Sequence, residues 1–407
     1  MVRSDPHPVH RFESWQVWPG SFENPPVDGE FPAPESGRFA ITPKTPIVSL
    51  GSCFAREIKR RLTQRNYNYL TEETYHPATI HASAAWERVY STHCMRQIFG
   101  YTFEQWQPEL RWWTAPISKT IQDPYRRVIL YDRLKDAEED FERHRHHSRN
   151  VLQQAEVLIL TLGLTEIWQD TIDGSVICVP AGPYVEEGGD ISRYRFRVSR
   201  YAENLENLER IYEIMSVYNP DCKIIITVSP VNLWATFRQD MDVISASCNS
   251  KATLRAVADE FTVRHDNVHY FPAFEMATIY QPLSGSTYFS DGRDNFHINK
   301  PTVKFIMQHF FRFFNDRFFG RFVSIRIQLE QYMAGTPLLL AFETVFLFFV
   351  ILRQGLLFNL DRFAHAIGIQ TQIGETYAFG GHKPLRMLFV IGLNGSIIRV
   401  SHSRLGR

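Results

Sequence analysis

The chain has 407 residues, of which 44% are hydrophobic and 14% aromatic, a composition that supports a sizeable core and excludes a disordered protein. The 44 Lys and Arg residues balance 44 Asp and Glu residues, so the charge gives no indication of nucleic acid as a partner. The five cysteines form an odd set without a CxxC pair, which argues against a disulfide framework or a zinc ribbon and fits a reducing cytoplasm.

The N-terminal segment, residues 1–46, is rich in Pro, Gly and aromatic residues, as in WPGSFENPPVDGEFPAPESG, and is predicted to be an extended arm. Its start, MVRSDPHPVHRFESW, contains no apolar stretch of the kind that a secretion signal needs. A cytoplasmic location is therefore expected.

From residue 47 onward, short apolar runs alternate with helical patterns. The predicted strands are 47–50, 157–162, 222–231 and 268–275, and the predicted helices are 54–64, 132–154, 201–220, 249–265 and 299–318. Strands without a polar face, separated by helices, indicate a parallel sheet covered on both sides. Because ligands bind outside the carboxyl ends of such strands, Ser52, Gly163, Ser229 and the loop before the last helix are expected to converge on one edge.

The C-terminal segment, residues 319–407, is apolar and basic. Its run 337–352 contains Glu343 and is shorter than the roughly 20 residues that a bilayer crossing needs, so membrane association is not favoured. The sequence RMLFVIGLNGSIIRVS predicts a hairpin around Asn394-Gly395.

The stretch IVSLGSCFAREI, residues 47–58, places Ser52 and Cys53 where a predicted strand turns into a helix. A nucleophile there is exposed at the sheet edge, beside a helix N-terminus that stabilises anions and lowers the pKa of a thiol. In the structural alternative, Ser52 caps the helix and Cys53 fills a gap in the core. The stretch by itself leaves both interpretations open.

Two further segments carry candidate catalytic groups. In DGRDNFHINK, the spacing of Asp294 and His297 suits a general base whose ring is oriented by a carboxylate, although such pairs are also common in surface loops. In TLGLTEIW, Gly163 ends a strand, and a backbone N–H or the Thr165 hydroxyl there is placed to donate to an oxyanion, unless Thr165 only caps the turn.

The order of these three segments is similar to the block order of the SGNH (GDSL-like) hydrolases. The chain resembles in particular the GSCFA family, whose motif stands here as Gly51-Ser52-Cys53-Phe54-Ala55. Over roughly residues 40–318 the resemblance extends to DPYR, TLGLTEIW, ENLENLERIY, TVSPVNLWATF, SKATLRAVAD and YFPAFE.

The resemblance implies a three-layer α/β/α, flavodoxin-like domain over 47–318, to which this chain adds the arm 1–46 and the appendage 319–407. It also implies an esterase or O-acyltransferase that acts on a small acyl ester, such as an acetylated glycan, through a covalent acyl-enzyme. In that mechanism Cys53 or Ser52 attacks the carbonyl. His297 serves as base and then acid, and Asp294 orients it. The expected oxyanion and binding residues are Gly51, Gly163, Thr165 and Glu166.

The chain also departs from the SGNH pattern. Written against GDS, the run GSC puts Ser52 at the Asp position and Cys53 at the nucleophile position, and the G-x-N-D block reads Gly163-Leu164-Thr165-Glu166. The glycine of the second block is not identified, and its region is WERVYSTHCMRQIFG, residues 86–100. A second hypothesis is therefore a module that lost the chemistry and binds a glycan or a protein. No cofactor or metal is expected, because HRHH at 144–147 lies in a charged helix that is predicted to face solvent.

Overall fold

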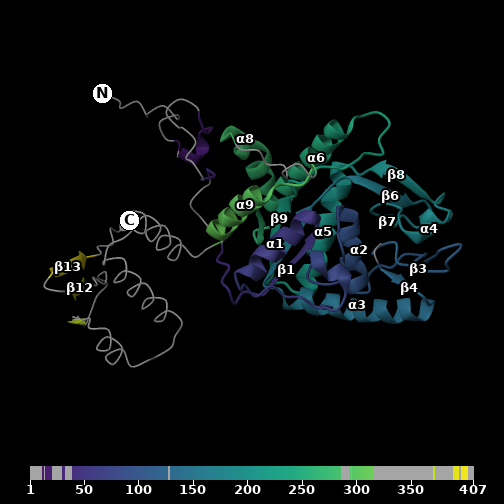
Figure 1. Cartoon of the computed structure of the whole chain (residues 1–407), viewed down its shortest axis with the longest axis horizontal. Coiled ribbons are helices and arrows are strands. Elements are labelled where there is room, and N and C mark those ends of the chain that lie inside the picture. The colour runs from purple at the N-terminus through teal and green to yellow at the C-terminus, as the bar shows by residue number, and fades with distance from the viewer. Residues whose placement is uncertain are drawn as a thin grey trace. The chain divides into compact units, whose positions relative to one another are not determined.

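The computed structural model describes residues 12, 14–20, 30–32, 39–126, 129–285, 294 and 296–314, and the backbone of 370–371, 388–393 and 396–401 (Figure 1). The chain divides into two units, 1–320 and 321–407. Within the described residues, no helix is both long and apolar enough to cross a membrane. The apolar run 337–352 lies outside the described residues.

The first unit is built on a parallel sheet of four strands in the order β1-β5-β9-β10. These strands are β1 (Ile47–Gly51), β5 (Val157–Leu162), β9 (Lys223–Val228) and β10 (Val268–Tyr270). Every residue of β1 and β5 is buried, as expected for a sheet with both faces covered. The predicted α/β class with a parallel sheet is confirmed.

Helices cover both faces of this sheet (Figure 1). The main helices are α1 (Cys53–Gln64), α2 (Thr92–Thr102), α3 (Leu134–Gln154), α5 (Tyr201–Tyr218), α6 (Val243–Arg264) and α9 (Lys300–Phe313). Helices α1 and α9 share one apolar cluster with residues of the sheet, and α2, α3, α5 and α6 contribute to the cluster on the other face.

Helix α1 is fixed to the sheet by Phe54, Ile58 and Leu62, which are fully buried and four residues apart. Spacing by four places side chains on one side of a helix. Burying a large apolar side chain stabilises the fold by about 1.5–3 kcal/mol. This stripe therefore fixes the position of the helix N-terminus, where Cys53 lies.

Strand β10 is shorter than the predicted strand 268–275. It ends at Tyr270, and the short helix α7 (Ala273–Glu275) begins after Pro272. Proline has no N–H for a strand ladder, so Pro272 prevents the strand from continuing, although the apolar pattern runs on. A π-helical turn η4 (Met276–Tyr280) and α8 (Gln281–Leu283) follow.

Smaller elements surround the main sheet. One three-stranded antiparallel sheet contains β2 (Trp113–Thr114), β3 (Ile121–Gln122) and β4 (Leu130–Tyr131). A second contains β6 (Glu166–Asp170), β7 (Val176–Ile177) and β8 (Tyr194–Val198). The remaining short helices are η2 (Ser14–Gln16), η3 (Pro77–His81) and α4 (Pro183–Glu186). Because β6 begins within TLGLTEIW, the loop after β5 is only a few residues long.

The second unit contains an antiparallel sheet of β11 (Gln370–Thr371), β12 (Leu388–Leu393) and β13 (Ser396–Ser401). Leu393 pairs with Ser396, which is the register that a hairpin with a two-residue connection requires. The predicted pairing of the strands on either side of Asn394-Gly395 is therefore confirmed.

Candidate active site

Ser52 is the N-cap of α1 and is buried. Its Oγ accepts a hydrogen bond from the Phe54 N–H at 3.3 Å, and its own N–H donates to Thr161 Oγ1 at 2.9 Å. Only 2% of the residue is exposed. These contacts give Ser52 the structural role that was one of the two alternatives for this position.

Replacing Ser52 with alanine is expected to destabilise the protein without removing its reactivity. Loss of a serine N-cap costs about 1 kcal/mol of the free energy of unfolding. Urea denaturation measures that loss, and alkylation of Cys53 in the folded variant measures the reactivity. A folded Ser52→Ala protein in which Cys53 no longer reacts would show that Ser52 does more than cap the helix.

Cys53 is the first residue of α1, and its side chain is partly exposed. The thiol is hydrogen-bonded to His297 and to Tyr90, whose hydroxyl oxygen lies 3.4 Å from the sulfur. Burial by itself raises the pKa of the Cys53 thiol. The hydrogen bonds with His297 and Tyr90 and the charge of Arg88 outweigh burial and lower the pKa below its ordinary value.

His297 and Asp294 form a pair on the loop before α9. Nδ1 of His297 lies 3.1 Å from Oδ2 of Asp294, and the His297 N–H donates to Oδ1 at 2.8 Å. The hydrogen bond with Cys53 raises the pKa of His297, and the bond to Asp294 raises it further. The backbone N–H of His297 lowers the pKa of Asp294. Because Nδ1 faces Asp294, Nε2 is the nitrogen left for Cys53.

The structure therefore brings together Cys53, His297 and Asp294, which lie far apart in the sequence. A thiol with a lowered pKa beside an imidazole with a raised pKa favours the thiolate–imidazolium pair. About 38% of the His297 side chain and 31% of the Asp294 side chain are exposed, so solutes reach the pair.

Arg88 and Tyr90 are two site residues that the sequence analysis did not identify. Both lie within 86–100, the region to which the second block was assigned. Arg88 interacts electrostatically with Cys53 and forms an ion pair with the buried Glu87 at 3.1 Å. Burial, together with the nearby Cys53 charge, raises the pKa of Tyr90, so its hydroxyl stays a hydrogen-bond donor. The fold brings them to Cys53, and an arginine and a tyrosine at these positions of the sequence do not by themselves predict that contact.

The loop after β5 uses its polar groups within the protein. The N–H groups of Gly163 and Leu164 both donate to the Tyr90 carbonyl at 3.0 Å. Thr165 is fully buried, and its Oγ1 lies 2.8 Å from Ser250 Oγ. A donor already bound inside the protein is a poor oxyanion ligand. This geometry therefore does not support the expectation that Gly163 and Thr165 donate to an oxyanion.

Glu166, the fourth residue of this block, accepts hydrogen bonds from the Thr236 hydroxyl at 2.5 Å and from the Phe237 N–H at 3.2 Å. Only 6% of Glu166 is exposed. The carboxylate thus fastens the segment after β9 to β6, and this geometry gives it no contact with Cys53.

The two predicted glycines are required by steric constraints. Gly51 has φ of +142°, and a Cβ there would lie 2.1 Å from Thr161 Oγ1. A Cβ on Gly163 would lie 2.7 Å from the Tyr90 carbonyl oxygen. Both distances are too short for any side chain, so these glycines allow β1, β5 and the Tyr90 segment to approach closely.

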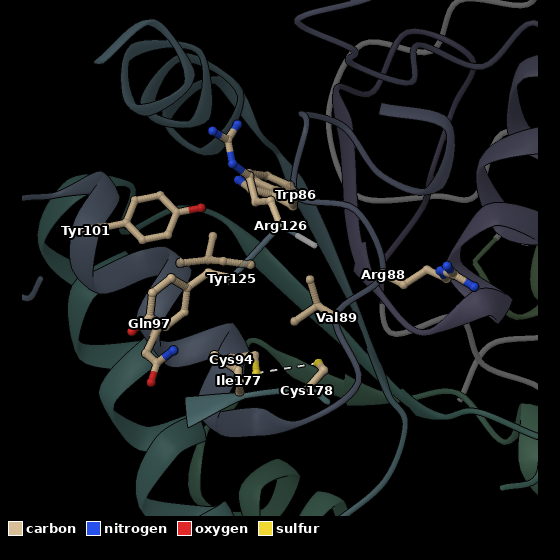
Figure 2. A pocket seen from close by; sticks show the side chains of 11 residues that line it. Trp86, Arg88, Val89, Cys94, Gln97, Tyr101, Tyr125, Arg126, Ile177 and Cys178 are labelled. Carbon is tan, nitrogen blue, oxygen red and sulfur yellow. Dashed lines mark hydrogen bonds between the residues drawn. The ribbon is translucent and has the colours of Figure 1, made fainter. Parts of the chain in front are cut away.

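A small cavity lies between the segment 86–101 and residues 125–126 and 177–178, and Figure 2 shows the side chains that line it. The Cys94 and Cys178 sulfurs lie 3.6 Å apart there. The Arg88 side chain extends away from the other lining residues (Figure 2). Cys53 and His297 do not line this cavity, so we do not assign the substrate to it.

His144 corrects the expectation that HRHH faces solvent. It is fully buried, with Nδ1 2.9 Å from Glu73 Oε2 and Nε2 3.0 Å from the Tyr101 hydroxyl. The charged residues around it in α3 hid this inward-facing position. Among the described residues, no group of three His, Cys, Asp or Glu side chains gathers in a way that suits a metal ion.

Comparisons with known proteins give one family and a weak structural likeness. No curated protein matches the chain. A solved structure, "Salicylyl-Acyltransferase SsfX3 from a Tetracycline Biosynthetic Pathway", is similar at 11% identity and a TM-score of 0.21, over 40% of this chain and 38% of that one. A likeness this weak carries no argument. The GSCFA family model matches residues 46–310. The chain therefore belongs to the GSCFA family.

Proposed function

We propose that this protein is an SGNH-like acyl-transfer enzyme, an esterase or O-acyltransferase, that uses Cys53 as its nucleophile. The observation that carries the proposal is a hydrogen-bonded series of three side chains. Cys53, at the N-terminus of α1, is hydrogen-bonded to His297, which is hydrogen-bonded to Asp294. A nucleophile, a base and a group that orients the base are the three parts that covalent acyl transfer needs.

In the first half of the proposed reaction, the Cys53 thiolate attacks the carbonyl carbon of an ester. The tetrahedral intermediate then expels the alkoxide, which takes the proton of the His297 imidazolium and leaves as an alcohol. The product on the enzyme is a thioester. In the second half, neutral His297 removes a proton from water or from an acceptor hydroxyl, whose oxygen attacks the thioester. The Cys53 thiolate leaves, and His297 is again protonated.

The oxyanion is best placed at the beginning of α1. The Cys53 N–H is the first amide of the helix and has no acceptor within the helix. The next two amides are already used, because the N–H groups of Phe54 and Ala55 donate to the Ser52 side chain and carbonyl. The Tyr90 hydroxyl lies 3.4 Å from the sulfur and Arg88 interacts electrostatically with it, so both would support a negative oxygen there.

A small acyl group is the proposed substrate, with an acetylated glycan as the proposed source by analogy with related hydrolases. A thioester passes its acyl group to a hydroxyl acceptor as readily as to water, so the chemistry of Cys53 suits an acyltransferase as well as an esterase.

The test is the rate at which each cysteine reacts with iodoacetamide between pH 5 and 9, followed by peptide mass spectrometry. At pH 6.5 an ordinary thiol is only about 1% ionised. Cys53 is expected to react at least about tenfold faster than the exposed Cys248, because its pKa is lowered. Its rate should rise with pH earlier than that of Cys248, since the thiolate is the reactive form.

Two other cysteines serve as negative controls. The hydrogen bond with Cys178 and burial raise the pKa of Cys94, and burial raises the pKa of Cys222 to about 12. Both are expected to stay unlabelled. Equal, slow labelling of Cys53 and Cys248 would count against the enzyme. It would support the second candidate, a binding module, which the fully occupied donors of residues 163–165 favour.

A further inference from the structure

Lys251 is a buried lysine in the middle of α6 that the proposed mechanism does not use. Only 3% of it is exposed, and its Nζ donates a hydrogen bond to the Gly163 carbonyl at 2.7 Å. Burial lowers the pKa of Lys251 to about 7, and the Cys53 charge acts in the opposite direction. A negative Cys53 therefore favours the charged form of Lys251, and a positive Lys251 favours the thiolate in return.

Lys251 is also connected to Cys53 through hydrogen bonds. Its Nζ donates a hydrogen bond to the Gly163 carbonyl, and the Gly163 N–H donates to the Tyr90 carbonyl at 3.0 Å. The Tyr90 hydroxyl in turn contacts the sulfur of Cys53. The preceding residue, Ser250, binds the Thr165 hydroxyl and N–H. Two adjacent residues of α6 thus fix the loop that supports Tyr90.

A buried ammonium is costly when it has only a carbonyl as its partner. A methionine of similar length fills the same space without that cost, so packing does not explain a lysine at this position. Cys53 is the charged group of the site that acts on Lys251, and His297, Tyr90 and Arg88 in turn act on Cys53. Of these, the Cys53 thiolate is the anion that compensates the Lys251 charge.

We infer that Lys251 is a positioning residue that stabilises the Cys53 thiolate, both by its charge and by holding the loop after β5, whose N–H groups bind the Tyr90 carbonyl. The inference deepens the proposed function and rests on it, because a thiolate at Cys53 matters only if Cys53 is the nucleophile. It assigns to α6 a part in the reaction, although no residue of α6 contacts the substrate in the mechanism above.

The experiment measures the pH dependence of Cys53 alkylation in wild type, Lys251→Gln and Lys251→Met. Glutamine removes the charge but keeps an N–H donor for Gly163, and methionine removes both. Both variants are expected to react with iodoacetamide about tenfold more slowly at pH 6.5, which corresponds to a rise of about one unit in the pKa of Cys53. Lys251→Arg, which keeps the charge, is expected to restore much of the rate.

Lys59→Met is the matched control. Lys59 also donates to backbone carbonyls, those of Thr79 and Ala82 at 2.7 and 2.8 Å, and burial lowers its pKa to about 8. The Lys59→Met variant should leave the pH profile of Cys53 alkylation unchanged. A folded Lys251→Gln protein with the wild-type profile would overturn the inference alone. An ordinary thiol profile in the wild type would instead overturn the proposed function.

Discussion

Replacing His297 with alanine is expected to lower kcat/KM for an activated acetyl ester by about 10³-fold or more. His297 is hydrogen-bonded to Cys53 and is the base that both halves of the proposed reaction need. Without it, the thiol loses the hydrogen bond and the charge that lower its pKa. Steady-state hydrolysis of 4-nitrophenyl acetate measures the loss.

The matched control for this variant is His147→Ala. His147 also pairs with a carboxylate, with Nδ1 2.7 Å from Glu72 Oε2, but it belongs to α3 and has no thiol partner among its described contacts. It should keep the wild-type rate. A His297→Ala protein that is folded and turns over normally would eliminate the proposed mechanism.

Replacing Cys53 with alanine is expected to reduce turnover as severely as the loss of His297, although Ser52 remains in place. Ser52 is buried, and its oxygen is used by the helix cap, so it should not substitute for the thiol. The double variant Cys53→Ala/His297→Ala should lose no further activity, because residues that act in one mechanism have non-additive effects.

Cys248→Ala is the control for the thiol, because Cys248 is an exposed cysteine of α6 that the proposed mechanism does not use. It should keep full activity. If Cys53→Ala retained turnover while Ser52→Ala abolished it, the nucleophile would be Ser52 and the assignment made here would be reversed.

The sequence alone predicted the framework that positions the site. The runs that became β5 and β9 are mainly apolar and have no polar face, and they could be recognised because both faces of a parallel sheet are buried. The convergence of Cys53 with His297 follows from the same topology, since loops after parallel strands meet at one edge. The end of β10 was missed, because Phe271 continues the apolar pattern while Pro272 ends the strand.

The supporting residues could not be predicted in the same way. Lys251 lies in a helix of mixed composition, where a lysine is ordinarily exposed, and only the packing of α6 against the loop after β5 buries it. Thr165 is a second residue whose contacts local patterns did not predict. Its position after a strand suggested an oxyanion donor or a turn cap, and in the folded chain its hydroxyl is hydrogen-bonded to Ser250. Such roles depend on contacts between distant segments, which local patterns do not encode.

The central claim, a covalent acyl-enzyme on Cys53, is tested most directly by mass spectrometry of the intact protein and its peptides. Wild type and His297→Ala are exposed briefly to 4-nitrophenyl acetate and quenched in acid. We expect one acetyl group per wild-type chain on the peptide that contains Cys53, and a strongly reduced amount in His297→Ala. Acetylation scattered over many residues, or equal in the two proteins, would contradict the account.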